Sequence, residues 1–258
     1  MKKAVFHIGY PKTGTTTLQH FLADNIDTLR ENGYYYAERT FISHVGNASD
    51  IYIAGLPGFD PEALKKIFDE DVKKSEGLTI LYSHEVLFNL EHDFYSFLAD
   101  YFDEIKIIVY LRRQDKWLES YKRWQISAGV PMKESKREVP YRMTDYHKVI
   151  KKVAKHLGSS AILIRPFERK QFYKQNINYD FLEVLGIPEE KFETFSHSKK
   201  VLNISMNGKA LVFKKLLNRY LPLRAYQLKN SKDVFGTWRG THISKALGEF
   251  PLDAEDKA

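Results

Sequence analysis

The N-terminal part of the chain carries a strand-like pattern followed by a helix-like pattern. A short apolar run covers residues 4–8 and stops at Gly9. From Thr15 onward, apolar residues recur at the spacing of an amphipathic helix, at Leu18, Phe21, Leu22, Ile26 and Leu29. Gly33 ends this pattern, as glycine commonly does at a helix C-terminus. The pattern therefore predicts a strand, a tight loop and one helix that ends at Gly33.

Further apolar runs alternate with helical patterns along the chain. Short runs rich in branched residues, typical of buried parallel strands, cover residues 78–82, 105–111 and 161–164. Amphipathic patterns predict helices over residues 61–75, 115–124 and 144–157. This alternation predicts an α/β fold, a parallel central sheet flanked by helices on both faces. Ligands of such sheets bind at the carboxyl ends of the strands.

The length of the chain indicates a single domain over residues 1–258. From about residue 200 the pattern is weaker and predicts one helix over residues 205–218, followed by an aromatic and basic extension. Residues 129–143 are polar and bounded by prolines. We expect them to form a loop over the carboxyl edge of the sheet.

The balance of charged residues indicates which partners the protein would attract. Lysine and arginine number 40 against 33 acidic residues, which gives a net charge of +7 and favours anionic partners such as nucleotides or acidic glycans. Cysteine is absent, which excludes a disulfide framework and thiolate metal sites and suits a reducing cytoplasm. No apolar run approaches the roughly 20 residues that span a bilayer, and the N-terminus lacks a cleavage signal. We therefore expect a cytoplasmic protein without stable membrane insertion.

The loop after the first strand has the glycine spacing of a phosphate-binding loop. Nucleoside triphosphatases carry G-x-x-x-x-G-K-[ST], in which the lysine directly follows the second glycine. Gly9 and Gly14 keep that spacing here. Thr15 stands at the lysine position, however, and the lysine is Lys12, inside the loop. Backbone amides at the helix start can still bind one anionic group, helped by the helix dipole. The alternative is a structural turn without a ligand.

The stretch YPKTGTT, residues 10–16, resembles the first signature of the sulfotransferases that use 3′-phosphoadenosine 5′-phosphosulfate (PAPS). The resemblance implies a P-loop-like sulfotransferase fold, PAPS as donor, adenosine 3′,5′-bisphosphate (PAP) as product and no required metal. It also implies that the phosphosulfate is bound by Pro11, Lys12, Thr13, Gly14, Thr15 and Thr16. Lys12 would contact the oxygen that bridges phosphorus and sulfur, where an ammonium stabilises the charge of the departing group. Weaker similarity to bacterial members extends over about residues 3–195.

A second motif runs from a predicted strand into a predicted helix. Arg112 stands at the strand end, and Ser120 follows eight residues later in the helix. The family carries an arginine and a serine with this spacing, and the resemblance implies that they bind the 3′-phosphate of the donor. A guanidinium and a hydroxyl together suit a compact dianion. Arg113 is a further candidate, and the sequence does not decide which of the two arginines points inward.

Sulfuryl transfer needs a base, and the strand over residues 78–82 leads to two candidates. His84 and Glu85 follow Ser83 directly. By resemblance, some members carry a histidine here, whereas glycan-acting and many bacterial members carry a glutamate in an S-x-E setting. That register favours Glu85, while His84 has the more convenient ordinary pKa. Both remain candidates, and a capping or solvated side chain is the structural alternative for each.

The acceptor is less defined by the sequence. Trp117, Tyr121 and Trp124 follow the second motif, together with basic Lys122 and Arg123, and the polar loop adds Lys133 and Arg137. These residue types favour a carbohydrate or glycolipid hydroxyl as acceptor, without excluding an amine. The stretch GTWRGTH, residues 236–242, faintly resembles a cofactor-closing loop of animal members, which would give roles to Trp238 and Arg239.

Two other function classes remain as alternatives. A P-loop kinase or ATPase would need a lysine directly after Gly14 and an acidic residue at a strand end for magnesium. The lysine is missing, and Glu85 is the candidate for the second. A non-catalytic nucleic-acid binder could exploit the net charge of +7, but the chain has no recognisable binding module and no dominant basic block. We therefore expect a small-molecule or glycan acceptor and no nucleic-acid partner. The sequence does not define the oligomeric state.

Overall fold

The computed structural model describes residues 1–37, 46–56, 58–128, 141–196 and 208–220. The chain divides into two compact units. The first unit is Met1–Arg113 with Asp145–Lys200, and the second is Gln114–Thr144 with Val201–Ala258. The single domain over residues 1–258 stays a prediction.

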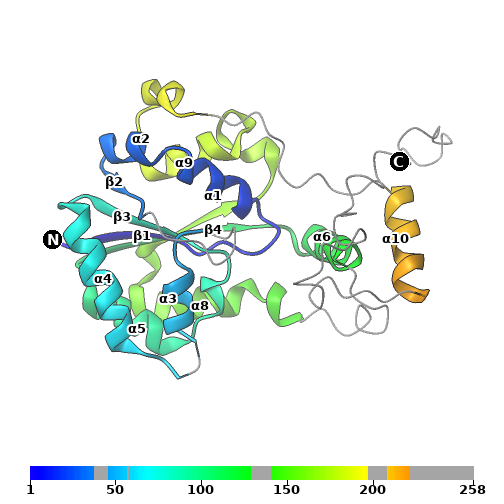
Figure 1. The fold of residues 1–258 in the computed structure, drawn as a ribbon, viewed down its shortest axis with the longest axis horizontal. Helices are drawn as coiled ribbons and strands as arrows, with labels where there is room; N and C mark the ends of the chain where they lie inside the picture. The colour runs from blue at the N-terminus through cyan, green and yellow to red at the C-terminus, as the bar shows by residue number, and fades with distance from the viewer. Residues whose placement is uncertain (38–45, 57, 129–140, 197–207, 221–258) are drawn as a thin grey trace, which may run out of the picture. The chain divides into compact units, whose positions relative to one another are not determined.

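A parallel sheet forms the centre of the first unit (Figure 1). Its strands are β1 (Lys3–His7), β2 (Tyr34–Tyr35), β3 (Thr79–Ser83), β4 (Glu104–Leu111) and β5 (Ile162–Pro166). The five strands follow the order β2-β3-β1-β4-β5, and every neighbouring pair is parallel. Because β1 lies between β3 and β4, segments that leave the carboxyl ends of these three strands emerge side by side.

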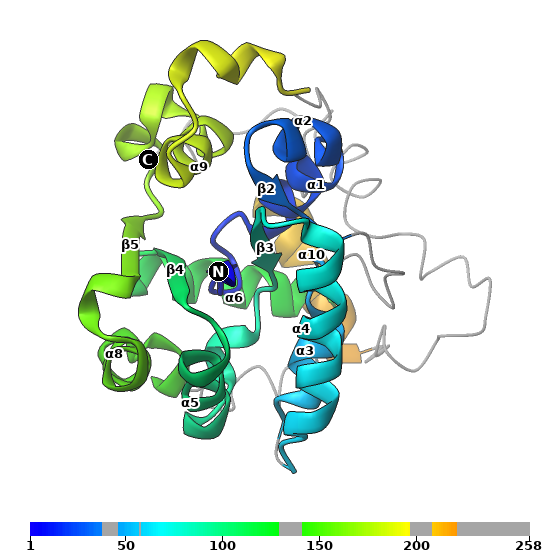
Figure 2. The same cartoon turned by 90° about the vertical axis from the view of Figure 1, so that its left-hand side faces the viewer.

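Helices cover both faces of this sheet. The first unit contains α1 (Thr15–Ala23), α2 (Ile26–Glu31), α3 (Ser49–Ala54), α4 (Pro61–Ser75), α5 (His92–Tyr101), α8 (Tyr146–Leu157) and α9 (Ile177–Leu185). Figures 1 and 2 show α1, α2 and α9 over one face, and α3, α4, α5 and α8 over the other. The predicted α/β class with a parallel sheet is therefore confirmed. The second unit contributes α6 (Gln114–Ser127) and α10 (Gly208–Tyr220).

The two sheet faces bury different clusters, since neighbouring residues of a strand point to opposite faces. On β1, Val5 packs with Leu18 of α1 and Phe181 of α9 in one apolar cluster. Phe6 points the other way and stacks on Tyr82 with ring centroids 4.8 Å apart. Both clusters are fully buried, so β1 is fixed from both sides.

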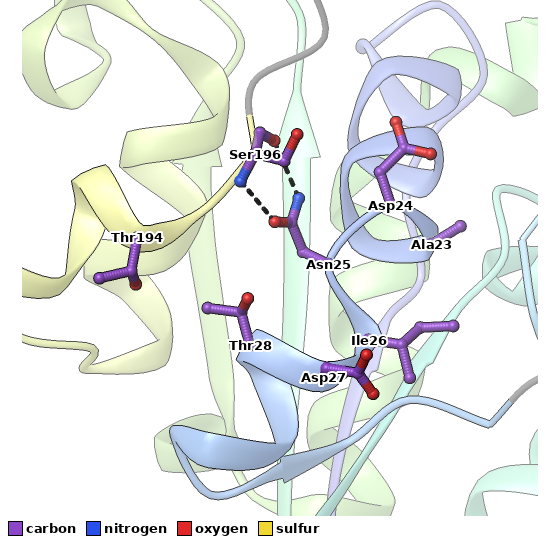
Figure 3. Close-up of a pocket in the computed structure, with 8 residues that line it drawn as sticks. All are labelled: Ala23, Asp24, Asn25, Ile26, Asp27, Thr28, Thr194 and Ser196. Carbon is purple, nitrogen blue, oxygen red and sulfur yellow. Dashed lines mark hydrogen bonds between the residues drawn. The ribbon is translucent and has the colours of Figure 1, made fainter.

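The helix predicted from Thr15 to Gly33 is divided in two by Asn25. The Asn25 amide donates to the carbonyls of Phe21 (2.7 Å) and Ser196 (3.0 Å), and its oxygen accepts from the Ser196 N–H (2.6 Å). The side chain thus bonds backbone groups around the turn, which ends α1 and starts α2 (Figure 3). This turn also borders a polar cavity of about 280 Å³, and none of the predicted site residues lines it.

Strong local signals gave the closest agreement with the predicted elements. The helix predicted over residues 61–75 is α4, because Asp60 accepts from the Ala63 N–H (2.9 Å) and Pro61 opens the first turn. The helix predicted over residues 205–218 is observed as α10, residues 208–220. Lys133, Arg137, Trp238 and Arg239 lie outside the described residues. No helix in the described ranges is long and apolar enough to cross a membrane.

Candidate active site

The loop between β1 and α1 is held in an unusual backbone conformation. Lys12 (φ 69°) and Gly14 (φ 75°) both lie in the left-handed region. The Thr13 hydroxyl donates to the Tyr10 carbonyl (2.5 Å) and ties the loop to itself. A side chain at Gly14 would also lie 2.8 Å from Ile177 and 2.9 Å from Phe167. Glycine is therefore required at this position for both its conformation and its close packing.

The loop leads into the N-terminus of α1, whose backbone N–H groups suit an anion. Gly14 is the N-cap, where no side chain caps the helix, and its carbonyl accepts from the Leu18 N–H (3.1 Å). The N–H groups of the first helical turn lack intrahelical partners and carry the positive end of the helix dipole. Lys12 adds a cation that is half-buried. Burial lowers the pKa of its ammonium, while Glu85 opposes that shift and Arg112 adds to it.

Glu85 reaches this loop directly. The Thr15 hydroxyl donates to Oε2 of Glu85 at 2.8 Å, although the two residues are far apart in the sequence. The two strands that precede these residues, β1 and β3, are hydrogen-bonded at their carboxyl ends, because the His84 N–H donates to the His7 carbonyl (3.1 Å). The buried His7 ring also bonds the Ser83 hydroxyl through Nδ1 (2.9 Å). The predicted loop and the predicted glutamate are thus brought together.

His84 points into a different environment. Its ring is buried and stacks on Tyr52 of α3, with centroids 5.5 Å apart, and Nδ1 accepts from the Val86 N–H (3.4 Å). Burial lowers the pKa of His84 to about 4, with Asp50 opposing the shift. The expectation that His84 has an ordinary histidine pKa is therefore wrong, because burial disfavours the charged form of the ring.

The segment after Glu85 is held by contacts that sequence analysis missed. The Tyr95 hydroxyl of α5 donates to the Leu87 carbonyl (3.0 Å). Lys152 of α8 donates to the carbonyls of Phe88 and Leu90. Phe88 in turn stacks on Tyr10 of the loop, with ring centroids 4.1 Å apart. Contacts from α5, α8 and the loop thus hold the segment that follows Glu85. The spacing of residues along the chain does not predict these contacts.

Arg112 also reaches the loop, from the end of β4. Its guanidinium Nη1 donates to the Lys12 carbonyl at 3.2 Å and lies over the Phe167 ring, 5.6 Å from its centroid. The Tyr146 hydroxyl fixes the Arg112 backbone by donating to its carbonyl (2.7 Å). A planar guanidinium has five N–H donors, so one bond to the loop leaves others for an anion. Arg112 therefore contacts the loop between β1 and α1 directly.

Ser120 lies on α6 in the second unit, together with the aromatic residues noted in the sequence. Trp117 and Tyr121 stack with centroids 4.9 Å apart, and Tyr121 lies 5.5 Å from Trp124. Trp124 is 39% exposed, whereas Trp117 is buried. The convergence of Ser120 with Arg112 stays a prediction.

Comparison with known proteins identifies the family. The model of the sulfotransferase domain family matches residues 4–179, about the range over which the sequence resemblance was expected. The chain belongs to the sulfotransferase domain family. The matched range contains the loop, Glu85 and Arg112. Among the described residues, no group of three or more histidine, cysteine or acidic side chains is arranged to hold a metal ion.

Individual relatives of this sulfotransferase domain are distant. An uncharacterized protein of Archaeoglobus fulgidus is 34% identical over 82 residues, which are 32% of this chain and 22% of that protein. The solved structure of a sulfotransferase from Alicyclobacillus acidocaldarius is 15% identical with a TM-score of 0.44, over 100% of both chains. A sulfotransferase domain from the Curacin biosynthetic pathway is 13% identical with a TM-score of 0.43, over 98% of this chain and 99% of that chain.

Proposed function

We propose that this protein transfers the sulfuryl group of PAPS to a hydroxyl or amine acceptor. The observation that carries the proposal is the direct bond between an anion-binding loop and a carboxylate, from the Thr15 hydroxyl to Glu85 at 2.8 Å. The loop offers a site for an anion, and the carboxylate offers a proton acceptor beside it. Family membership supports sulfuryl transfer as the chemistry that joins them.

The residues present suit the phosphosulfate of the donor. Gly14 takes a left-handed conformation and packs closely against Ile177 and Phe167, and the first-turn N–H groups of α1 follow it. Lys12 and Arg112 supply positive charge from two different strand ends. This donor set is made of backbone amides, hydroxyls and fixed cations, which is the chemistry that binds phosphate and sulfate esters.

Each residue then has a distinct task in the transfer. PAPS supplies the activated sulfuryl group, and PAP is the product that remains. Lys12 stabilises negative charge on the oxygen from which the sulfuryl group departs. Glu85 orients the acceptor and takes its proton. Arg112, with Ser120, binds the 3′-phosphate and so selects the donor from nucleotides that lack it.

For the acceptor we propose a carbohydrate or glycolipid hydroxyl. Trp124 on α6 exposes an aromatic ring, and such rings pack against the apolar faces of sugars. Lys122 and Arg123 on the same helix would favour an acidic glycan. We also propose a cytoplasmic location, because a sequence without cysteine suits a reducing compartment.

Transfer of radiolabelled sulfate from PAPS tests the proposal. The purified protein is incubated with PAPS and a panel of glycans, glycolipids, phenols and amines, and labelled products are separated. We expect label in at least one acceptor, and slow release to water without one. Hydrolysis or transfer of the terminal phosphate of ATP, with no use of PAPS, would instead support a kinase or ATPase.

A further inference from the structure

We propose that the Thr15 hydroxyl positions Glu85 and does not bind the donor. The inference rests on the proposed function, since it divides the work between two neighbouring threonines of the same loop. It departs from the expectation that Thr15 and Thr16 both bind the phosphosulfate. The geometry points to this division because the hydroxyl of Thr15 already holds the carboxylate of Glu85.

The hydroxyl of Thr15 has one proton to donate. It donates this proton to Oε2 of Glu85 at 2.8 Å. A carboxylate is a strong acceptor, and a hydrogen bond to a charged group is worth more than one between neutral groups. A donor anion could take this proton only by displacing Glu85, which would leave the carboxylate without this bond.

Packing fixes the direction of that hydroxyl. Thr15 is 2% exposed, and its methyl group lies against the backbone of Gly9. A Cβ atom built on Gly9 would lie only 2.4 Å from that methyl carbon. Because threonine has few allowed rotamers in a helix, a fixed methyl group fixes the hydroxyl as well. Gly9 therefore serves the site by leaving room for the rotamer that points Thr15 at Glu85.

Thr16 is the better candidate for donor recognition. It is the next residue of α1, it is half-buried, and its hydroxyl makes no hydrogen bond to another described residue. Thr15 keeps Glu85 beside the loop, where the carboxylate interacts with Lys12. The proposal assigns the anion to the Thr16 hydroxyl, to Lys12 and to the backbone N–H groups of the first turn. The two threonines should therefore respond differently to the same substitution.

The test compares valine variants of three consecutive threonines, since valine keeps the shape and removes the hydroxyl. Two quantities are measured for each: calorimetric affinity for PAP, and turnover of PAPS with the best acceptor or with water. Thr15→Val should lower turnover about tenfold to hundredfold and leave the PAP dissociation constant within about twofold. Thr16→Val should weaken PAP binding about tenfold. Thr17→Val is the matched control for the substitution itself.

Thr15→Ser separates a positioning role from a packing role. Serine restores the hydroxyl without the methyl group that fixes its direction, so we expect part of the lost turnover to return. Thermal melting of each variant confirms that it is folded. The proposal is overturned if Thr15→Val weakens PAP binding as much as Thr16→Val does, or if it keeps normal turnover. Failure of the wild-type protein to bind PAP at all would instead overturn the proposed function, on which this inference depends.

Discussion

Lys12 occupies a backbone conformation that lysine rarely adopts, with φ at 69°, and its half-buried ammonium lies within the electrostatic reach of Glu85 and Arg112. Such a conformation persists only where surrounding contacts hold it, here the bond from Arg112 to the Lys12 carbonyl. Position and charge together suit an ammonium that stabilises a transition state.

Replacing Lys12 tests that role. Lys12→Met keeps the apolar stem and removes the charge, so turnover of PAPS should fall about 10²-fold or more, because charge on the leaving oxygen loses its partner. PAP lacks the sulfate, and its affinity should fall much less. Lys66→Met, at an exposed position of α4, controls for loss of a positive charge. Near-normal turnover in Lys12→Met would contradict the assignment.

The two candidate bases are separated by a pair of variants. Glu85→Gln keeps an oxygen that accepts from Thr15 but removes the proton acceptor, so turnover should fall about 10²-fold while PAP binding survives. His84→Asn should cost much less, since the His84 ring packs on Tyr52 and takes no part in the bond between Thr15 and Glu85. Kinetics of both variants at saturating PAPS measure the difference. An active Glu85→Gln enzyme beside an inactive His84→Asn enzyme would reverse the assignment.

A pH profile does not replace these variants. The ordinary pKa of histidine would predict loss of activity below about pH 6.5 for a histidine base. Burial lowers the pKa of His84 to about 4, however, so a His84 base would also remain unprotonated near pH 5. A profile that is flat down to pH 5 therefore does not exclude His84.

At the scale of elements, the segment from His84 to Leu90 depends on α8 for its position. Lys152 donates to two of its carbonyls, and burial lowers the pKa of this lysine, with Glu91 opposing. Its ammonium thus caps the short helical turn over Leu87–Asn89, which follows Glu85. The sequence gives no sign of this contact, because it joins residues more than 60 positions apart.

Lys152→Met should loosen that segment without touching the anion loop. We expect turnover to fall about tenfold and the free energy of unfolding to drop by about 1–2 kcal/mol, since the carbonyls lose a charged donor. PAP affinity should stay close to that of wild type. Lys151→Met, at an exposed position of the same helix, is the matched control. Equal effects of the two variants would show that Lys152 has no specific positioning role.

The helices and strands that could be predicted from the sequence are those whose signals lie within the element itself. The apolar runs predicted β1, β3, β4 and β5 to within one or two residues, and the amphipathic pattern over residues 61–75 predicted α4. β2 was missed, because two tyrosines form a strand only by pairing with β3. The break between α1 and α2 was missed as well, since Asn25 makes it by bonding Ser196 far along the chain.

The candidate site followed the same rule. That Lys12, Glu85 and Arg112 lie close together could be predicted, because parallel strands bring their carboxyl ends to one edge. The orientation of His84 and the partner of Thr15 could not, since both are set by side-chain packing between elements. The motifs thus point to these residues, whereas their side-chain contacts are visible only in the fold.

For the whole molecule, two buried histidines make stability depend on pH. Burial lowers the pKa of both His7 and His84 to about 4, from 6.5 in the unfolded chain, with Asp50 opposing at His84. Between these values the unfolded state binds more protons, so stability is full above about pH 6.5 and is lost as the pH falls toward 4. Each histidine should contribute on the order of 2–3 kcal/mol.

Thermal melting between pH 7 and about pH 4.5 measures this dependence. His84→Gln should flatten the loss of stability on acidification, because one of the two buried rings no longer takes up a proton on unfolding. His147→Gln, at an exposed position of α8, is the matched control for the substitution. An identical slope in wild type and His84→Gln would show that His84 does not contribute.

The central claim is that the loop between β1 and α1 binds a 3′-phosphorylated adenine nucleotide for sulfuryl transfer. Calorimetric titration of the wild-type protein with PAP, adenosine 5′-phosphate and ATP, each with and without magnesium, tests it most directly. We expect tight binding of PAP that does not depend on magnesium, and binding of the other two that is weaker by about tenfold or more, since a charged partner of the 3′-phosphate is lost. Magnesium-dependent binding of ATP in preference to PAP would contradict the account.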